Sequence, residues 1–271
     1  MNLSKNMNLE KIASNLLGSK ITKISHCNDG GNSRIFKVKH KEKLYALKFY
    51  RQEKSKDNTR LQKETQALNF LSSFNHFSSP DFISSDKENN CALLEWIEGN
   101  KIEKWNKEEI TQAATFIQSL EEVKNDPLAK DIGYGTDACF SFCDLEQQII
   151  KRLNILEKSS NKLLRERLNN LFLPLFYEII DWAKKGLNGK EKNRKAKISK
   201  EKMTLSPVDF GFHNCLRNKE GKLVFLDFEY FGWADPVNLV SDTLLHPGMN
   251  LSLKKRNQIF QKLKIIYIKD Q

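Results

Sequence analysis

A carboxylate ends a nearly continuous apolar run late in the chain. Residues 223–226 read Leu-Val-Phe-Leu, and Asp227 follows them directly. Such a run predicts a buried strand, and an acid at its end needs a cation, a metal or several donors to stay ionised. The turn sequence at residues 218–221 predicts a tight hairpin that folds Asn214 back towards Asp227. The chain is therefore expected to bring an amide and an acid together at the end of this hairpin.

A second acid, Asp209, lies just before the hairpin in a segment of mixed turn and apolar character. An acid, an amide and an acid in this order suit phosphoryl transfer from a nucleotide. One acid would orient a hydroxyl, and the other two residues would bind Mg²⁺ through oxygen. The alternative is a hairpin whose acids only cap turns. Asp235, followed by Pro236, is expected to cap the next helix.

The histidines give no metal-ligand spacing in the sequence. His213 is adjacent to Asn214, but neighbouring strand residues face opposite sides, so His213 is expected to point away from the metal. The other four are scattered along the chain: His26, His40, His76 and His246.

The first part of the chain is predicted to be rich in strands, at residues 20–26, 35–38, 44–50, 80–84 and 91–97. Gly30, Gly31 and Ser33 lie in the connection between the first two strands. Glycines let backbone amides approach a phosphate closely. The same residues also suit an ordinary hairpin turn, so this loop alone leaves both interpretations open.

A predicted helix at residues 58–72 has an acid on its apolar stripe. Leu61, Leu68 and Leu71 lie on one side by helical periodicity, and Glu64 lies between them. Lys48 lies inside an apolar strand. Lys48 could be a solvated lysine on an edge strand, or it could pair with Glu64 and bind nucleotide phosphates.

Helices dominate from residue 106 onwards, where Asn106 and Glu109 form a capping-box pattern. Further helices are predicted at residues 142–156, 163–185, 237–245 and 253–268, and Pro174 is expected to end or kink the second of these. The prediction is an α+β fold of two lobes. Residues 1–98 form a small antiparallel sheet with one helix, and residues 99–271 form a larger helical lobe. The Lys-rich stretch 184–202 is expected to be a mobile loop.

Composition narrows the classes of protein. The chain has 271 residues, a net charge of +11 and five scattered cysteines. Unpaired cysteines favour a reducing compartment, hence the cytoplasm. No apolar run is long enough for a membrane span, and the first residues do not resemble a signal peptide. The basic stretch lacks interleaved aromatic residues, which disfavours a nucleic-acid site.

Six segments, in this order, resemble the aminoglycoside phosphotransferase and choline kinase family, which has a protein-kinase-like fold. They are Gly30 to Ser33, Ala46 to Lys48, the helix around Glu64, Leu93 to Gly99, Asp209 to Asn214, and Leu226 to Glu229 with Asp235 and Pro236.

The resemblance implies a kinase that uses ATP and Mg²⁺. Gly30, Gly31, Ser33 and Lys48 would contact the phosphates, with Glu64 as the partner of Lys48. Backbone groups of Glu95 and Ile97 would contact adenine. Asp209 would be the catalytic residue, and Asn214 and Asp227 would bind the metal. Protein kinases are disfavoured, because no Ala-Pro-Glu sequence follows Asp227 and only a short stretch of chain remains.

Two departures from the family pattern concern the catalytic loop and the acceptor pocket. Pro207 stands where the family commonly has a loop-organising histidine, and Asn238 and Leu239 stand near the position of a further acid. The leading hypothesis is a kinase for a hydroxyl of a small molecule, such as a sugar, an amino alcohol or a cell-envelope precursor. A nucleotide-binding pseudokinase that acts as a scaffold or regulator is the alternative.

Overall fold

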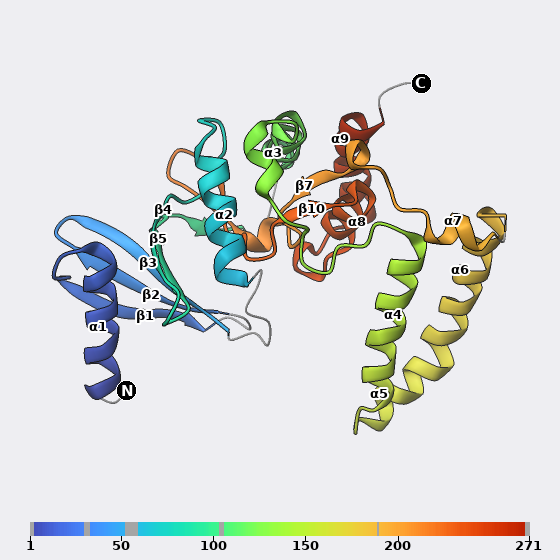
Figure 1. Ribbon diagram of the computed structural model, residues 1–271, viewed down its shortest axis with the longest axis horizontal. Helices are drawn as coiled ribbons and strands as arrows, with labels where there is room; N and C mark the ends of the chain where they lie inside the picture. Colours follow the sequence, from blue (N-terminus) through green and yellow to red (C-terminus); the bar gives the residue numbers. More distant parts are fainter. Residues whose placement is uncertain (1–2, 30–32, 52–58, 103–105, 189, 269–271) are drawn as a thin grey trace. The chain divides into compact units, whose positions relative to one another are not determined.

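The structure, a computed structural model, describes residues 3–29, 33–51, 59–102, 106–188 and 190–268 (Figure 1). The chain divides into two units. One contains Met1–Thr136 together with Thr204–Gln271, and the other is Asp137–Met203. The predicted lobe boundary between residues 98 and 99 lies inside the first of these units and stays a prediction. None of the described helices has both the length and the apolar character needed to cross a bilayer.

The first unit begins with a five-stranded antiparallel sheet in the order β1-β2-β3-β5-β4. Its strands are β1 (Lys23–Asp29), β2 (Ser33–His40), β3 (Lys43–Tyr50), β4 (Phe82–Asp86) and β5 (Cys91–Glu95). The antiparallel sheet predicted from the sequence is therefore confirmed. In the central strand β3, Lys48 pairs with Ile35 on one side and with Ala92 on the other. Lys48 is thus an interior residue of the sheet and does not lie on an edge.

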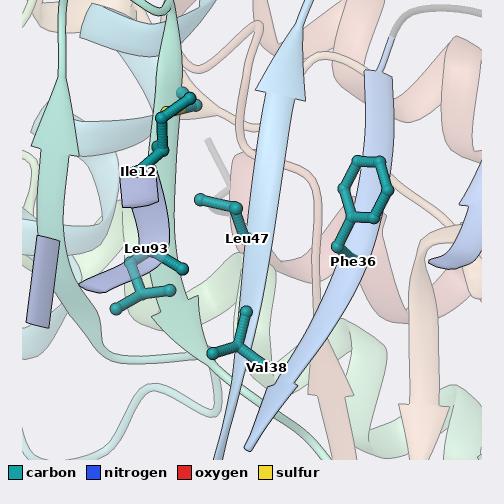
Figure 2. Close-up of a cluster of buried hydrophobic side chains, with 7 residues drawn as sticks. Ile12, Phe36, Val38, Leu47 and Leu93 are labelled. Atoms are coloured by element: carbon teal, nitrogen blue, oxygen red, sulfur yellow. The ribbon is translucent and has the colours of Figure 1, made fainter. Parts of the chain in front are cut away.

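Helix α1 (Leu3–Leu17) covers one face of this sheet and was not predicted. Ile12 and Ala13 are buried against side chains from β2, β3 and β5. Figure 2 shows Ile12 with Phe36, Val38, Leu47 and Leu93 of this cluster. The spacing of Leu9, Ile12, Leu16 and Leu17 is the apolar pattern of a helix, and it is the signal that could have predicted α1.

Helix α2 (Arg60–Ser72) lies against the opposite face of the sheet (Figure 1). Its first turn is closed by a capping box between Thr59 and Gln62. Successive strand residues point to opposite faces, so Leu47 faces α1 while Lys48 faces α2. The apolar stripe of α2 is buried as predicted, and Glu64 is buried with it.

The remainder of the first unit places two short sheets between helices. Its elements are β6 (Asn100–Lys101), α3 (Lys107–Val123), η1 (Pro127–Asp131), β7 (Thr204–Ser206), η4 (Phe212–Asn214), β8 (Cys215–Arg217), β9 (Leu223–Phe225), β10 (Gly232–Ala234), α8 (Pro236–Leu245), η5 (Pro247–Met249) and α9 (Leu253–Tyr267). Strands β6, β8 and β9 form one sheet, and β10 pairs with β7. The capping box of Asn106 and Glu109 is present as predicted. Asp235 caps α8 by accepting a hydrogen bond from the backbone N–H of Val237.

The second unit is helical. It contains α4 (Phe142–Glu157), α5 (Lys162–Arg167), the π-helical turn η2 (Leu168–Phe172), α6 (Leu173–Gly186), α7 (Glu191–Lys195) and η3 (Lys200–Lys202). Leu153, Leu168, Phe176 and Ile180 form its core. Pro174 lies in the first turn of α6, directly after the π-helical turn η2, so the change of helix type falls beside the proline.

The basic stretch 184–202 has more local structure than the sequence indicated. It contains α7, and Arg194 of α7 forms an ion pair with Glu146 of α4. Glu146 is buried, which explains why a basic residue is drawn to it. The predicted mobility of this stretch stays a prediction.

Candidate active site

Lys48 is a buried cation surrounded by three carboxylates. Its Nζ atom lies 2.6 Å from Glu64 Oε2, 2.6 Å from Asp227 Oδ1 and 3.3 Å from Glu229 Oε2. Burial alone would lower the pKa of Lys48, but the three acids outweigh it and raise the pKa above its usual value. Lys48 is therefore a charged ammonium. The structure brings Lys48 and Glu64 together, as the sequence indicated.

Glu64 is fixed by donors from three directions. Tyr50 donates its hydroxyl to Glu64 Oε2 at 2.6 Å, and the backbone N–H of Phe228 donates to Oε1 at 3.2 Å. Burial, and then the charge of Glu64, raise the pKa of Tyr50, so Tyr50 remains a neutral donor. With Lys48 added, each oxygen of the buried Glu64 has a partner. Glu64 therefore positions Lys48.

Glu229 belongs to this cluster, although the sequence analysis did not single it out as a site residue. It is 1% exposed, and its carboxylate lies near those of Glu64 and Asp227. Burial raises the pKa of Glu229 to about 7, against the opposing effect of Lys48. Arg60 lies 3.7 Å away as a second cation. The signal in the sequence was its position two residues after Asp227, in a segment that is otherwise apolar.

The hairpin places the backbone of Asn214 beside Leu226, the residue before Asp227. The backbone N–H of Leu226 donates to the carbonyl of Asn214 at 2.8 Å, and residues 218–221 form the predicted turn. Asp227 has a φ of 65°, a left-handed conformation that is uncommon for a residue with a side chain. Strain of this kind is found where a structure holds a side chain in a required direction. The Asp227 side chain is partly exposed, at 34%.

The residues at this point fit a magnesium ion. The Nδ2 of Asn214 donates a hydrogen bond to the backbone oxygen of Asp209 at 2.9 Å. The Oδ1 of the same amide takes no part in this bond. Mg²⁺ prefers carboxylate and amide oxygens and keeps several waters. One partly exposed carboxylate, one amide oxygen and the nearby acid Glu229 make up such a set. Both acids of this set lie against Lys48.

Asp209 follows β7 in a distorted turn. Val208 has a φ of 68°, and its N–H donates to the hydroxyl of Ser206 at 2.9 Å. The hydrogen bond from His213 lowers the pKa of Asp209 below its usual value, against the opposing effect of burial. Asp209 is therefore ionised at neutral pH. Asn214 links Asp209 to Leu226, the residue before Asp227.

The sequence placed His213 in a strand, and the structure does not; that its side chain points away from the metal residues stays a prediction. The residue lies in the single turn η4 and not in a strand, so strand alternation does not apply to it. Its Nε2 lies 2.8 Å from Asp209 Oδ1. His246, which showed no relation to the other histidines in the sequence, lies 3.5 Å from the same oxygen. Only the fold brings these three residues together.

The remaining predicted site residues are placed as follows. Gly30 and Gly31 lie outside the described residues. Ser33 begins β2 and pairs with Tyr50. Glu95 ends β5, and its backbone N–H donates to the carbonyl of Asp81 at 2.8 Å. Ile97 lies in the connection between β5 and β6. The contacts predicted for these residues with a nucleotide stay predictions.

Neither a family profile nor a curated protein sequence matches the chain. Similarity is found among solved structures. Spectinomycin phosphotransferase APH(9)-Ia, in complex with ADP and spectinomycin, has a TM-score of 0.64 at 13% identity, covering 98% of this chain and 80% of that chain. Choline kinase LicA from Streptococcus pneumoniae has a TM-score of 0.62 at 15% identity, covering 98% and 81%. APH(2'')-IIa, in a ternary complex with streptomycin and ATP, has a TM-score of 0.59 at 18% identity, covering 98% and 82%.

Identities this low establish the fold alone. The five-stranded antiparallel sheet followed by a largely helical part is common to this chain and these structures. The chain therefore has the kinase-like fold of aminoglycoside phosphotransferases and choline kinases, as the sequence predicted.

Proposed function

We propose that the protein is an ATP- and Mg²⁺-dependent phosphotransferase that phosphorylates a hydroxyl group of a small molecule. The observation that carries this proposal is the position of Lys48. A buried lysine reaches from the sheet to Glu64 on a helix and to Asp227 at the end of the hairpin. These are the groups that phosphoryl transfer requires on the nucleotide side.

On the donor side, Lys48 would bind the phosphates of ATP as a point charge. Glu64 would position Lys48, and the backbone of the loop with Gly30, Gly31 and Ser33 would cover the phosphates. Backbone groups of Glu95 and Ile97 would bind adenine. Several relatives in fold have been solved with ATP or ADP, which supports a nucleotide here.

Asn214 and Asp227 would hold Mg²⁺, with Glu229 as a neighbouring acid. When bound, the ion would neutralise charge on the phosphate oxygens. In the structure, Asp227 is paired with Lys48. When nucleotide and metal bind, we expect Asp227 to give up its ion pair with Lys48 and to bind the ion.

Asp209 would orient the acceptor hydroxyl and take its proton. The hydroxyl oxygen attacks the γ-phosphorus, the bond from that phosphorus to the bridging oxygen breaks, and ADP leaves. Because the pKa of Asp209 is lowered, Asp209 is a weak base. Its main contribution would therefore be the position of the hydroxyl, with the proton transferred late.

The acceptor is proposed to be neutral or anionic: a sugar, an amino alcohol or a cell-envelope precursor. A net charge of +11 is unsuited to a polycationic acceptor. Free cysteines at positions 27, 91, 139, 143 and 215 suit a reducing environment, and we propose the cytoplasm. A nucleic-acid partner is not favoured.

A turnover assay tests this proposal. Purified protein with Mg²⁺ and ATP is assayed for ADP release against a panel of sugars and amino alcohols. Asp209→Ala should reduce kcat by about 100-fold or more. Asp86→Asn is the matched control, since Asp86 is an acid that caps an exposed turn through Asn89. ATP binding without turnover on any acceptor would contradict the enzyme and favour the nucleotide-binding scaffold.

A further inference from the structure

A pair of histidines lies beside Asp209. The Nε2 atom of His213 is 2.8 Å from Asp209 Oδ1, and the Nε2 atom of His246 is 3.5 Å from the same oxygen. The two imidazole rings are stacked, with centroids 4.1 Å apart and an interplanar angle of 11°. Two rings from distant parts of the sequence thus converge on one carboxylate oxygen.

The ring of His213 is closely packed in place. A Cβ atom on Gly211 would lie 2.8 Å from its Cε1, and one on Gly248 would lie 2.9 Å from its Cγ. Both distances are too short for a real side chain, so the two glycines provide the space that the ring occupies. His213 therefore has little freedom to turn away from Asp209.

The hydrogen bonds around the two rings also indicate which nitrogen of each histidine carries the proton. His246 accepts the backbone N–H of Gly248 at its Nδ1 at 3.0 Å, so its ring proton lies on Nε2. His213 Nδ1 is buried and has no partner among the described residues. A buried N–H without a partner is costly, which places the proton of His213 on Nε2. Each histidine thus presents an N–H to Asp209 Oδ1.

We infer that His213 is the positioning residue of Asp209, with His246 as its stacked support. This inference rests on the proposed function. His213 fixes one carboxylate oxygen, while Asn214 fixes the backbone oxygen of the same residue. The other carboxylate oxygen is then the one that receives the acceptor hydroxyl. Pro207, two residues before Asp209, has no hydrogen-bond donor with which to hold the Asp209 carboxylate.

The kinetic test compares His213→Ala with His213→Gln. His213→Ala should lower kcat on the order of 100-fold, because the carboxylate is no longer held. The KM for ATP should stay within about 2-fold, since Lys48 and the metal residues are unchanged. His213→Gln keeps an N–H of similar reach and should recover most of the lost kcat. His246→Phe keeps the stacked ring and should have a smaller effect than His213→Ala.

His40→Ala is the matched control. His40 is also hydrogen-bonded, to the carbonyl of Lys20, and it lies at the end of β2. It should leave kcat unchanged. A His213→Ala protein with a lower thermal midpoint but unchanged kcat per folded molecule would overturn the inference. An equal loss of kcat in His213→Ala and His213→Gln would also overturn it.

A spectroscopic measurement separates this inference from the proposed function. In ¹⁵N-histidine-labelled protein, the Nε2 proton of His213 should be protected from exchange, and Asp209→Ala should abolish this protection without changing the His40 signal. An unchanged His213 signal would overturn the inference, whatever the activity. A wild-type protein that has the protected proton but turns over no ATP on any acceptor would overturn the proposed function, and the inference with it.

Discussion

The electrostatics of the site depend on single residues, and Lys48 is the cation that three carboxylates contact. Replacing it in Lys48→Met would leave three acids close together without their cation. The loss of one partner of a buried ion pair costs about 3–5 kcal/mol. We expect a loss of that order in the free energy of unfolding and at least about a 100-fold loss of kcat. Urea unfolding and steady-state kinetics measure the two effects.

Lys37→Met is the control for this substitution. Lys37 forms an exposed ion pair with Glu98 at 3.0 Å, and exposed pairs contribute below about 1 kcal/mol. Equal losses of stability in the two variants would show that the Lys48 cluster is not a buried network.

Glu229 gives a prediction about pH. Its folded pKa is raised to about 7 by burial, whereas an unfolded Glu titrates near about 4.3. The neutral acid is favoured by folding, so its contribution to stability is complete below the unfolded value and is lost as pH rises through 7. Without Mg²⁺, Glu229→Gln should therefore be more stable than wild type at pH 8, on the order of 2 kcal/mol, and similar at pH 4. Urea unfolding at the two pH values measures this difference, and a larger gain at the lower pH would contradict the account.

Among the secondary-structure elements, helix α7 is connected to α4 through one buried acid. Arg194 of α7 and Lys184 of α6 both form ion pairs with Glu146 of α4. Burial alone would raise the pKa of Glu146, but these hydrogen bonds outweigh it and lower the pKa below its usual value. The contribution of Glu146 to stability is thus present at neutral pH and is lost as pH falls through its lowered folded pKa.

Glu146→Gln should accordingly lower the free energy of unfolding by about 1–3 kcal/mol at neutral pH. The difference from wild type should shrink at about pH 3.5. Urea unfolding at the two pH values measures it. Glu166→Gln is the control, because Glu166 belongs to an exposed pair with Lys162 at 3.8 Å and should have little effect. A Glu146→Gln effect that does not change with pH would contradict the assignment.

The elements differ in how well the sequence predicts them. The five strands of the first sheet, the capping box of Asn106 and the hairpin turn follow from local patterns, and the structure contains them. Helix α1 has a clear apolar stripe but was not predicted. Helix α7 is short and polar and has no apolar stripe. The turn η4 has no periodic signal at all, and the assignment of His213 to a strand was wrong.

In the whole molecule, the site residues that the sequence predicts are the charged residues that stand beside apolar residues in the chain. Lys48 and Asp227 are 179 residues apart, yet each stands out as a charge beside apolar residues. A buried charge requires a partner, so the two could be expected to serve one site. The sequence around His246 has no such pattern. Tertiary packing brings His246 to Asp209, and a local sequence pattern cannot predict it.

The proposed function depends on a magnesium–nucleotide site in the unit that contains Lys48, Asn214 and Asp227. Isothermal titration calorimetry of ATP, with Mg²⁺ and with EDTA, tests it most directly in wild type, Asp227→Asn and the control Asp86→Asn. We predict that Mg²⁺ tightens ATP binding in wild type and in Asp86→Asn, and that Asp227→Asn loses this dependence. A wild-type protein that binds no ATP, or an Asp227→Asn protein with the full Mg²⁺ dependence, would contradict the account.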